Sequence, residues 1–347
     1  MNAKRSSVAR DLLDWYDVHA RDLPWRAKPG EAVDPYRVWL SEVMLQQTTV
    51  AAVTPRFVAW TARWPDFASL AAAGDADVMA AWAGLGYYAR ARNLVAAAKA
   101  VVADYGGQFP KTEAELRTLP GLGAYTAAAV AAIAFGERAV VVDANVERVV
   151  ARLCAIDTPL PGGRVAIRAA ADMITPDVRA GDFAQAMMDL GSGICTSRKP
   201  RCLLCPLRDH CEGHRTGAPE AFPVKAKKAA RPQRFGTIFW LESAGKVLLV
   251  RRPDKGLLGG MRALPTGPWV DTPPGLEGAP GQTDWRILDA TVSHGFTHFD
   301  LQLALASADI AAHHRRNEGE WWDVGDIESA GLPTIFAKAA KAIRSAA

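Results

Sequence analysis

The sequence predicts a mainly α-helical domain followed by a smaller α+β domain, and three observations support this prediction. Ala-rich segments, separated by short Pro or Gly breaks, run from residue 8 to about residue 196 and are typical of packed helices. Residues 214–234 combine three prolines with many Lys and Ala residues, which is typical of an inter-domain linker. Beyond this linker, apolar residues alternate as they do in strands. We therefore expect domains at 1–213 and 235–347.

Capping signals divide the helical domain. Asp75 is the expected N-cap of a helix that ends near residue 82, and Thr112 with Glu115 forms an expected capping box. Residues 139–142 are the strand-like run of this domain, and they are short enough to be a buried connector.

The second domain shows strand signals and a final helix. Residues 235–241 and 246–251 read as two strands joined by a turn at 243–245. Apolar residues at 299, 301, 303 and 305 predict a half-buried strand. A helix is expected over 334–346.

Composition excludes two classes of protein. The chain has 347 residues, of which 49% are hydrophobic and 22% charged, and its net charge is +4. This balance predicts a folded chain rather than a disordered one. The longest apolar stretch, residues 127–135, is far shorter than the roughly 20 residues of a membrane span. Charged residues also interrupt the N-terminal segment, so we expect no signal peptide, no membrane association and a cytoplasmic location.

Positive charge is concentrated in one segment. Residues 198–234 contain ten Lys or Arg and three Asp or Glu. Such a segment indicates a polyanionic partner, and a solvated basic linker is the alternative.

Four of the five cysteines are clustered within 17 residues. Their spacing is Cys-x6-Cys-x2-Cys-x5-Cys, and they are Cys195, Cys202, Cys205 and Cys211. Four thiolates around one compact volume predict a 4Fe–4S cluster. Zinc, with His210 or His214 as a substitute ligand, is the alternative. The fifth cysteine, Cys154, follows a helical apolar pattern, so we expect it in the core.

Residues 119–127, Leu-Pro-Gly-Leu-Gly-Ala-Tyr-Thr-Ala, join two predicted helices. Gly121 and Gly123 allow a tight turn, and a new helix is expected from about Ala124. The turn therefore directs backbone N–H groups and a positive helix end at one anion. This is the form of a helix–hairpin–helix, which binds phosphate without reading sequence. A simple helix C-cap is the alternative reading of the two glycines.

These motifs carry a resemblance to a known family. The helix–hairpin–helix, the downstream Asp143 and the cysteine cluster resemble the endonuclease III superfamily of base-excision DNA glycosylases. The runs 39–48, 84–93 and 185–191 are similar to its adenine DNA glycosylase (MutY) branch. The resemblance implies hydrolysis of the N-glycosidic bond of adenine opposite 8-oxoguanine or guanine in duplex DNA, by a monomer associated with a bacterial nucleoid. A thymine or uracil mismatch glycosylase of the same superfamily and a non-catalytic iron–sulfur DNA-binding protein are the alternatives.

Two carboxylates are the candidate catalytic groups. Glu42 lies among apolar residues of a predicted helix, which would raise its pKa towards that of a general acid. A solvent-facing Glu42 is the alternative. Asp143 is an expected helix N-cap. The resemblance implies that Glu42 protonates adenine and helps to activate water, and that Asp143 stabilises the cationic sugar through a transient covalent bond in a retaining mechanism.

Tyr125 sets the expected reaction type. Bifunctional members of the superfamily carry a Schiff-base lysine at this position, and a phenol cannot form the imine that strand cleavage requires. The resemblance therefore implies a monofunctional hydrolase. Tyr125 and Asn145 are expected to orient the Asp143 carboxylate or the intermediate, although Tyr125 could simply pack at the helix start.

Further residues are assigned to base extrusion and to the adenine pocket. The resemblance implies that Gln47 and Tyr87 insert into the base stack, where an amide and an aromatic face suit the task. Core packing beneath the Gly-Leu-Gly turn is the alternative for Tyr87. Arg26 and Gln185 are expected to line the adenine pocket.

The second domain resembles the Nudix-hydrolase-like C-terminal domain of the family at residues 251–253, 256–261 and 264–265. It has no Gly-x5-Glu run leading to a carboxylate cluster, so we expect no magnesium-dependent pyrophosphohydrolase activity. The family reads 8-oxoguanine with a Phe-Ser-His loop, and the matching residues are Phe296, Thr297 and His298. The threonine keeps the hydroxyl of the family's serine. Surface placement is the alternative for His298.

Overall fold

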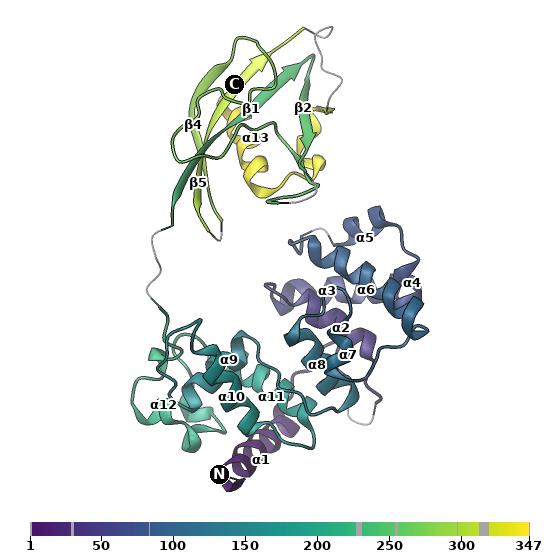
Figure 1. Ribbon diagram of the computed structural model, residues 1–347, viewed down its shortest axis with the longest axis vertical. Helices are drawn as coiled ribbons and strands as arrows, with labels where there is room; N and C mark the ends of the chain where they lie inside the picture. Colours follow the sequence, from purple (N-terminus) through teal and green to yellow (C-terminus); the bar gives the residue numbers. More distant parts are fainter. Residues whose placement is uncertain are drawn as a thin grey trace. The chain divides into compact units, whose positions relative to one another are not determined.

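The computed structural model describes residues 2–28, 31–82, 84–226, 231–253, 256–296, 298–311 and 319–346. The chain divides into two compact units, Met1–Lys227 and Lys228–Ala347, the first helical and the second built around a sheet (Figure 1). The first part of the expected linker is bonded to the helical unit. Arg152 Nε donates to the carbonyl of Phe222 (3.1 Å), and the backbone N–H of Leu160 donates to that of Val224 (2.9 Å). Within the described ranges, no helix is both long and apolar enough to span a membrane.

The first unit is built from helices joined by short turns. Their bounds are α1 (Asn2–His19), α2 (Pro35–Met44), α3 (Val50–Arg63), α4 (Phe67–Ala71), α5 (Asp75–Ala81), α6 (Ala89–Tyr105), α7 (Glu113–Leu116), α8 (Ala124–Phe135), α9 (Ala144–Leu153), α10 (Arg164–Ile174), α11 (Ala180–Gly193) and α12 (Glu212–Arg215). Short 3-10 turns follow α11 at η1 (Cys202–Leu204), η2 (Arg208–His210) and η3 (Pro219–Ala221). Residues 139–142 belong to no strand, and Ala139 and Val141 are buried, so the expected connector is confirmed.

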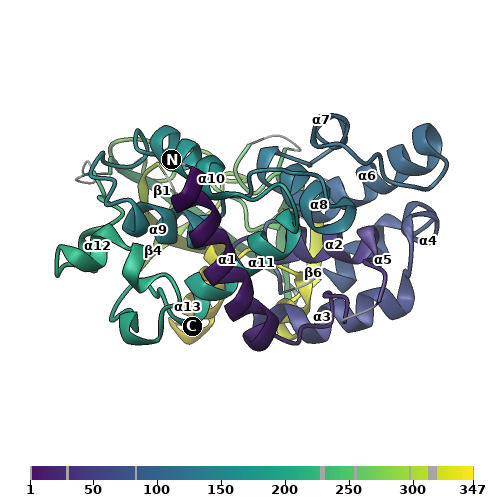
Figure 2. The same ribbon diagram turned by 90° about the horizontal axis from the view of Figure 1, so that it is seen from below.

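The helices of the first unit bury two hydrophobic cores. One core gathers α2 to α8 around side chains such as Trp39 and Trp82. The other gathers α1 and α9 to α11 around Leu12 and Val150, and Figure 2 shows α1 lying along α11. Met188 of α11 packs against both cores and joins them.

The predicted capping at Thr112 is confirmed in part, and the predicted N-cap at Asp75 is wrong. Thr112 is the N-cap of α7, and its hydroxyl accepts a hydrogen bond from the backbone N–H of Glu115 (3.3 Å). The Glu115 carboxylate accepts from the Thr112 hydroxyl (2.6 Å), whereas in a capping box it would accept from the backbone N–H of Thr112. Gly74 rather than Asp75 takes the extended N-cap conformation of α5, so the aspartate already lies inside the first turn. A carboxylate in that turn still faces the positive helix end.

The expectation that Cys154 lies in the core is wrong. Its side chain is exposed, and it forms the C-cap of α9 with φ −105°. Because the helix ends at Leu153, position 154 no longer continues the buried stripe of α9.

The second unit is a mixed sheet packed against a helix. Its elements are β1 (Gln233–Ser243), β2 (Lys246–Arg251), β3 (Arg262–Ala263), β4 (Arg286–Gly295), β5 (Asp300–Asp309), β6 (Glu320–Asp323), η5 (Val324–Ala330) and α13 (Thr334–Ala346). The strand order is β3-β2-β1-β5-β4, with β6 paired to β2. β1 and β5 are parallel, and the other pairs are antiparallel. Phe336 and Ile343 of α13 belong to the core that covers the sheet.

The strands at 235–241 and 246–251, the half-buried strand and the final helix are confirmed, whereas β4 went unpredicted. β4 is paired through β5 alone, and most of its side chains are exposed or half-buried. A strand with little burial carries no apolar alternation, which is the signal that sequence analysis relies on.

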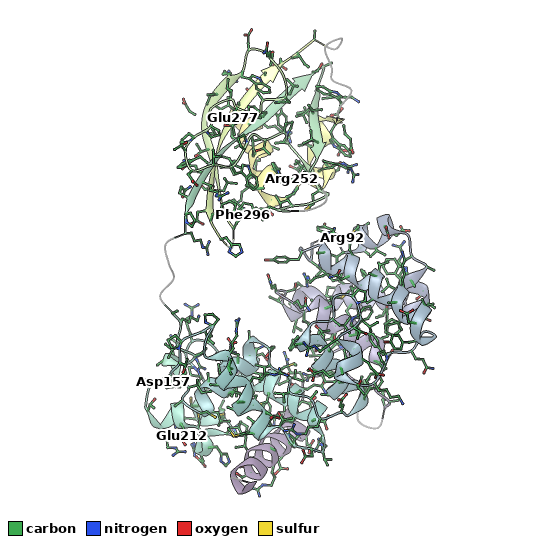
Figure 3. The ribbon with its side chains drawn as sticks, viewed as in Figure 1. Arg92, Asp157, Glu212, Arg252, Glu277 and Phe296 are labelled. Atoms are coloured by element: carbon green, nitrogen blue, oxygen red, sulfur yellow. The ribbon has the colours of Figure 1, made fainter. Side chains whose placement is uncertain are left out.

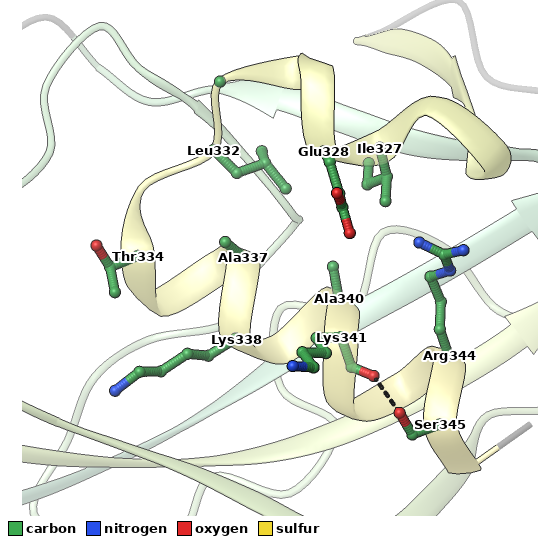
Figure 4. Close-up of a pocket in the computed structure, with 11 residues that line it drawn as sticks. Ile327, Glu328, Leu332, Thr334, Ala337, Lys338, Ala340, Lys341, Arg344 and Ser345 are labelled. Atoms are coloured by element: carbon green, nitrogen blue, oxygen red, sulfur yellow. Dashed lines mark hydrogen bonds between the residues drawn. The ribbon is translucent and has the colours of Figure 1, made fainter. Parts of the chain in front are cut away.

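A cavity of about 600 Å³ lies between η5 and α13 (Figure 4). Lys338, Lys341 and Arg344 border it together with Glu328 and apolar side chains. None of the residues that the sequence predicts for the functional site lines this cavity.

Candidate active site

Glu42 is the buried carboxylate of the first unit's candidate site. α2 begins after Asp34, whose side chain accepts from the backbone N–H of Tyr36, and Pro35 occupies the first turn. Every residue from position 38 to position 44 is buried, and Glu42 is 7% exposed. At this point α2 therefore has no solvent-facing side, and the alternative of a solvent-facing Glu42 is wrong.

The surroundings of Glu42 tune its protonation. The pKa of Glu42 is raised from 4.5 to about 7, and burial is the main cause. A hydrogen bond from Tyr125 opposes the rise, the negative charge of Asp143 adds to it, and the charge of Arg26 opposes it. The Tyr125 hydroxyl donates to Glu42 Oε2 at 2.5 Å. Burial also raises the pKa of Tyr125 well above 10, so the phenol keeps its proton and remains the donor.

The expected adenine-pocket residues share a pocket with Glu42. Arg26, Gln185 and Glu42 line a cavity of about 50 Å³, together with Leu45 and Met188. This volume is far below the roughly 300–1,000 Å³ of pockets that bury a drug-sized ligand. In this structure the cavity is therefore too small to enclose a ligand of that size.

Asp189 holds the pocket arginine in place, and the sequence analysis assigned it no role. The carboxylate of Asp189 is almost fully buried and accepts two hydrogen bonds from the Arg26 guanidinium, at 2.7 and 2.8 Å. Arg21 adds a bond from Nε at 2.5 Å and one from its backbone N–H at 3.2 Å. A carboxylate amid apolar residues of α11 is the sequence signal that could have found it.

Asp143 is the N-cap of α9, as the sequence predicts. Its Oδ1 accepts from the backbone N–H of Val146 (2.7 Å), and its Oδ2 accepts from Asn145 Nδ2 (2.9 Å). Asn145 is thus placed to orient Asp143. The Tyr125 hydroxyl bonds to Glu42 rather than to Asp143, so its expected role in orienting the intermediate stays a prediction.

A further arginine connects this carboxylate to the cysteine loop. Arg148 Nη2 donates to Asn145 Oδ1 (2.9 Å) and to the carbonyl of Gly191 (2.7 Å). Its Nε donates to the carbonyl of Cys195 (2.8 Å). A Cβ at Gly191 would lie 2.6 Å from that of Asn145, so only glycine lets α11 approach α9 this closely.

The predicted helix–hairpin–helix turn lies between α7 and α8. Gly121 has φ +75°, and a Cβ there would lie 2.6 Å from Asn93 Cβ. Gly123 is the N-cap of α8 with φ −74°, and a Cβ at this position would meet no other atom within 4 Å. Gly123 supplies no side-chain cap to the first N–H groups of α8. α8 begins at Ala124, as expected.

The two residues predicted to enter the base stack are both exposed. Gln47 follows α2, and Tyr87, which is 65% exposed, precedes α6. Their neighbours Gln46 and Tyr88 are half-buried. The core-packing alternative is therefore wrong for Tyr87.

The four clustered cysteines line one cavity in the segment after α11. Arg152, which is buried, donates to Cys195 Sγ (3.3 Å) and to the carbonyl of Thr196 (2.7 Å), and so fixes the loop that carries the first thiol. In the described part of the chain, no three His, Cys, Asp or Glu side chains are arranged to hold a single metal ion. Four thiols that share the walls of one cavity fit a multinuclear cluster that spans it.

In the second unit, the residues predicted to read 8-oxoguanine follow β4. Phe296, labelled in Figure 3, lies where β4 turns into β5, and His298 is exposed. The backbone N–H of Phe296 donates to the carbonyl of Phe299 (2.9 Å), and the ring of Phe296 contacts Trp269 at 5.5 Å between centroids. Thr297 lies outside the described residues.

Comparisons with known proteins match both units. Residues 40–169 match the HhH-GPD superfamily of base excision DNA repair proteins, residues 195–211 match the iron-sulfur binding domain of endonuclease III, and residues 237–342 match the NUDIX domain. The cysteine loop is thus an iron–sulfur cluster motif rather than a zinc site.

Similar proteins place the chain within this superfamily. Adenine DNA glycosylase of Mycolicibacterium smegmatis is 44% identical over 209 residues, which cover 60% of this chain and 70% of that protein. The human adenine DNA glycosylase is 36% identical over 319 residues, and this chain spans 58% of its length. The structure of a thermostable thymine-DNA glycosylase is 29% identical, covers 62% of this chain and 98% of its own, and has a TM-score of 0.55. On this evidence, the chain belongs to the adenine DNA glycosylase family.

Proposed function

We propose that this protein is a monofunctional DNA glycosylase that hydrolyses the N-glycosidic bond of adenine opposite 8-oxoguanine or guanine in duplex DNA. The observation that carries the proposal is Glu42, a buried carboxyl with a pKa of about 7 in a pocket shared with Arg26 and Gln185. A general acid works best when its pKa lies near the working pH.

Glu42 supplies the proton for the leaving base. About half of the Glu42 side chains are protonated near pH 7, and the pocket directs this proton at a base that has entered it. Protonated adenine is a far better leaving group, and general acid catalysis contributes about 10²–10⁴-fold to such steps. After the base departs, the carboxylate accepts a proton from the attacking water.

Asp143 stabilises the positive charge that develops on the sugar. Its carboxylate is held by Asn145 and by the backbone of Val146, so it does not have to reorganise as the charge forms. A retaining course, in which Asp143 bonds transiently to the anomeric carbon before water displaces it, matches the chemistry of paired carboxylates.

Tyr125 limits the reaction to hydrolysis. Its phenol donates to Glu42 and has no amine with which to form an imine, so this position supports no β-elimination of the DNA strand. The products are free adenine and an intact strand with an abasic site.

The target base leaves the duplex before the reaction. The first N–H groups of α8, which Gly123 leaves without a side-chain cap, bind backbone phosphate. Gln47 and Tyr87 fill the gap in the stack, where base stacking on an aromatic side chain is worth about 1–3 kcal/mol. The pocket at Glu42 widens as adenine enters.

The second unit inspects the base opposite adenine. Phe296 and His298 lie between β4 and β5, and the Phe296 ring packs against Trp269. The Thr297 hydroxyl takes the place of the family's serine in contacting 8-oxoguanine. We place the enzyme, as a monomer, on chromosomal DNA in a bacterial cytoplasm, where other repair proteins continue the pathway.

Cys195, Cys202, Cys205 and Cys211, which line one cavity, would hold an iron–sulfur cluster of the 4Fe–4S type. Such a cluster would cross-link the loop between α11 and α12 and so fix it. Arg148 donates both to this loop at Cys195 and to Asn145, so the order of the loop also supports Asp143.

Single-turnover assays on a panel of duplexes test the proposal. We expect adenine release from A opposite 8-oxoguanine and, more slowly, from A opposite guanine, with strands that break only after alkali. Glu42→Gln should lose at least about 10²-fold in rate because it cannot donate the proton. Glu31→Gln, which changes an exposed glutamate before α2, is the matched control and should retain the wild-type rate.

Two outcomes of the same panel would contradict the proposal. Release of thymine or uracil instead of adenine would support the mismatch-glycosylase alternative, and full activity of Glu42→Gln would show that Glu42 is not the acid.

His298→Ala should reduce the preference for 8-oxoguanine over guanine while the rate on A opposite guanine stays unchanged.

A further inference from the structure

We propose that Arg90 is a positioning residue that binds both the loop after α2, which carries Gln47, and the turn before α6, which carries Tyr87. Gln47 and Tyr87 would then enter the duplex as one rigid unit. We call this unit the wedge, and the bonds of Arg90 to the two loops the lock. This inference rests on the proposed function. Arg90 lies in the first turn of α6, and neither the sequence motifs nor the active-site geometry above gives it a role.

The guanidinium of Arg90 assigns one terminal nitrogen to each loop. Nη1 donates to three carbonyls at the end of α2, those of Val43 (2.8 Å), Met44 (3.2 Å) and Gln46 (2.7 Å). Nη2 donates to two carbonyls of the turn before α6, those of Leu85 (2.7 Å) and Gly86 (3.2 Å). The Val43 carbonyl also accepts from the backbone N–H of Gln46 (3.4 Å), and the Gln46 carbonyl also accepts from the Thr48 hydroxyl (3.2 Å). Arg90 therefore adds a charged donor to a helix end that is already partly bonded.

The bonded carbonyls immediately precede the two inserted residues. Gln46 precedes Gln47, which has φ +57°, and Gly86 precedes Tyr87, which has φ +47°. Left-handed backbone is rare at residues other than glycine, and it persists only where the surrounding structure enforces it. The carbonyl of one residue and the N–H of the next belong to the same planar peptide group, so a hydrogen bond to that carbonyl restrains the φ of the next residue. Arg90 therefore restrains the positive φ of both Gln47 and Tyr87.

Arg90 also contacts two aromatic rings beside the turn before α6. The Arg90 guanidinium lies 5.1 Å from the centroid of Trp82 and 5.8 Å from that of Tyr87. Trp82 Nε1 also donates to the carbonyl of Gly86 (2.9 Å), so Gly86 is held from two sides. The planar fork of arginine is needed for this arrangement, since a lysine ammonium is a single point that cannot serve both loops.

The lock has a direct consequence for catalysis. If the two loops moved independently, insertion would have to order them, and the conformational entropy lost would weaken binding. Loops that are already held in the inserted geometry avoid this cost. Loss of the lock should therefore lower the fraction of extruded adenine and the rate that depends on it. Misplacement of about 1 Å at a distance from the reacting atoms can cost on the order of 10²-fold.

Arg90→Lys tests this with 2-aminopurine in place of adenine opposite 8-oxoguanine, because this base fluoresces when it leaves the stack. We expect a lower extrusion signal and, on the adenine duplex, a single-turnover rate reduced on the order of 10- to 100-fold. Arg92→Met is the matched control, since it removes an exposed arginine two residues further along α6 (Figure 3) and should stay within about twofold of wild type. Added guanidinium should restore part of the extrusion signal to Arg90→Ala.

A double-mutant cycle tests the lock with Arg90 intact. If the loops act as one wedge, the effects of Gln47→Ala and Tyr87→Ala on extrusion should depart from additivity by about threefold or more. Additive effects in this cycle, or wild-type extrusion and rate in Arg90→Lys, would overturn the inference. Failure of the wild-type protein to release adenine would instead overturn the proposed function.

Discussion

At the scale of single residues, the burial that raises the pKa of Glu42 also destabilises the fold when this carboxyl is ionised. Burial accounts for most of the rise in its pKa, because the ionised form loses its water without gaining a matching cation. Arg26 is nearby, but its guanidinium is already paired with Asp189. The carboxyl is therefore poised between its two forms.

Glu42→Gln should stabilise the first unit at alkaline pH. A pKa raised from 4.5 in the unfolded chain to about 7 in the folded protein corresponds to about 3 kcal/mol. Because the raised pKa favours the protonated folded state, this stability is fully present below pH 4.5 and is lost as the pH rises through 7. Thermal unfolding should show the variant to be more stable than wild type at pH 8.5, with the gain shrinking towards pH 5. An equal difference at both pH values would contradict the account.

At the scale of elements, the two glycines of the turn before α8 differ in what the fold requires of them. Gly121 takes a left-handed φ, and a Cβ there would clash with Asn93, so the fold itself requires glycine. Gly123 has an ordinary φ and open space beside it, so the fold does not require glycine there, and we propose that the approach of a phosphate does. The same turn thus contains an internal comparison.

Gly121→Ala should destabilise the protein by about 1–3 kcal/mol through backbone strain and the clash with Asn93. Gly123→Ala should leave thermal stability nearly unchanged but weaken binding to duplex DNA, because the new methyl group occupies the approach to the helix N-terminus. Thermal unfolding and fluorescence anisotropy measure the two effects. Wild-type DNA affinity in Gly123→Ala would show that the turn holds no phosphate.

At the scale of the whole molecule, sequence patterns predicted the features that a short continuous segment determines. The start of α8, the N-cap at Asp143 and the cysteine loop are each encoded within a short run, and each is present in the structure. The pattern around Glu42 predicted a helix but did not decide whether the Glu42 side chain is buried or faces solvent. Apolar neighbours in sequence do not show which side of a helix packs against the rest of the protein.

Interactions between distant segments could not be predicted from such runs. Tyr125 bonds to Glu42 across 83 residues of sequence, and Arg26 to Asp189 across 163. Arg90 bridges segments that meet only when α2 and α6 pack together. Cys154 was misplaced because the end of α9, not its apolar periodicity, decides where that side chain points.

The pH dependence of single-turnover adenine release is the measurement that tests the role of Glu42 most directly. Since the protonated carboxyl is the active form, the rate should fall as the pH rises through about 7. The hydrogen bond from Tyr125 lowers the pKa of Glu42, so Tyr125→Phe should move this break to higher pH. A rate that stays flat from about pH 5.5 to 8.5, or a break that Tyr125→Phe leaves in place, would contradict the assignment of Glu42 as the acid.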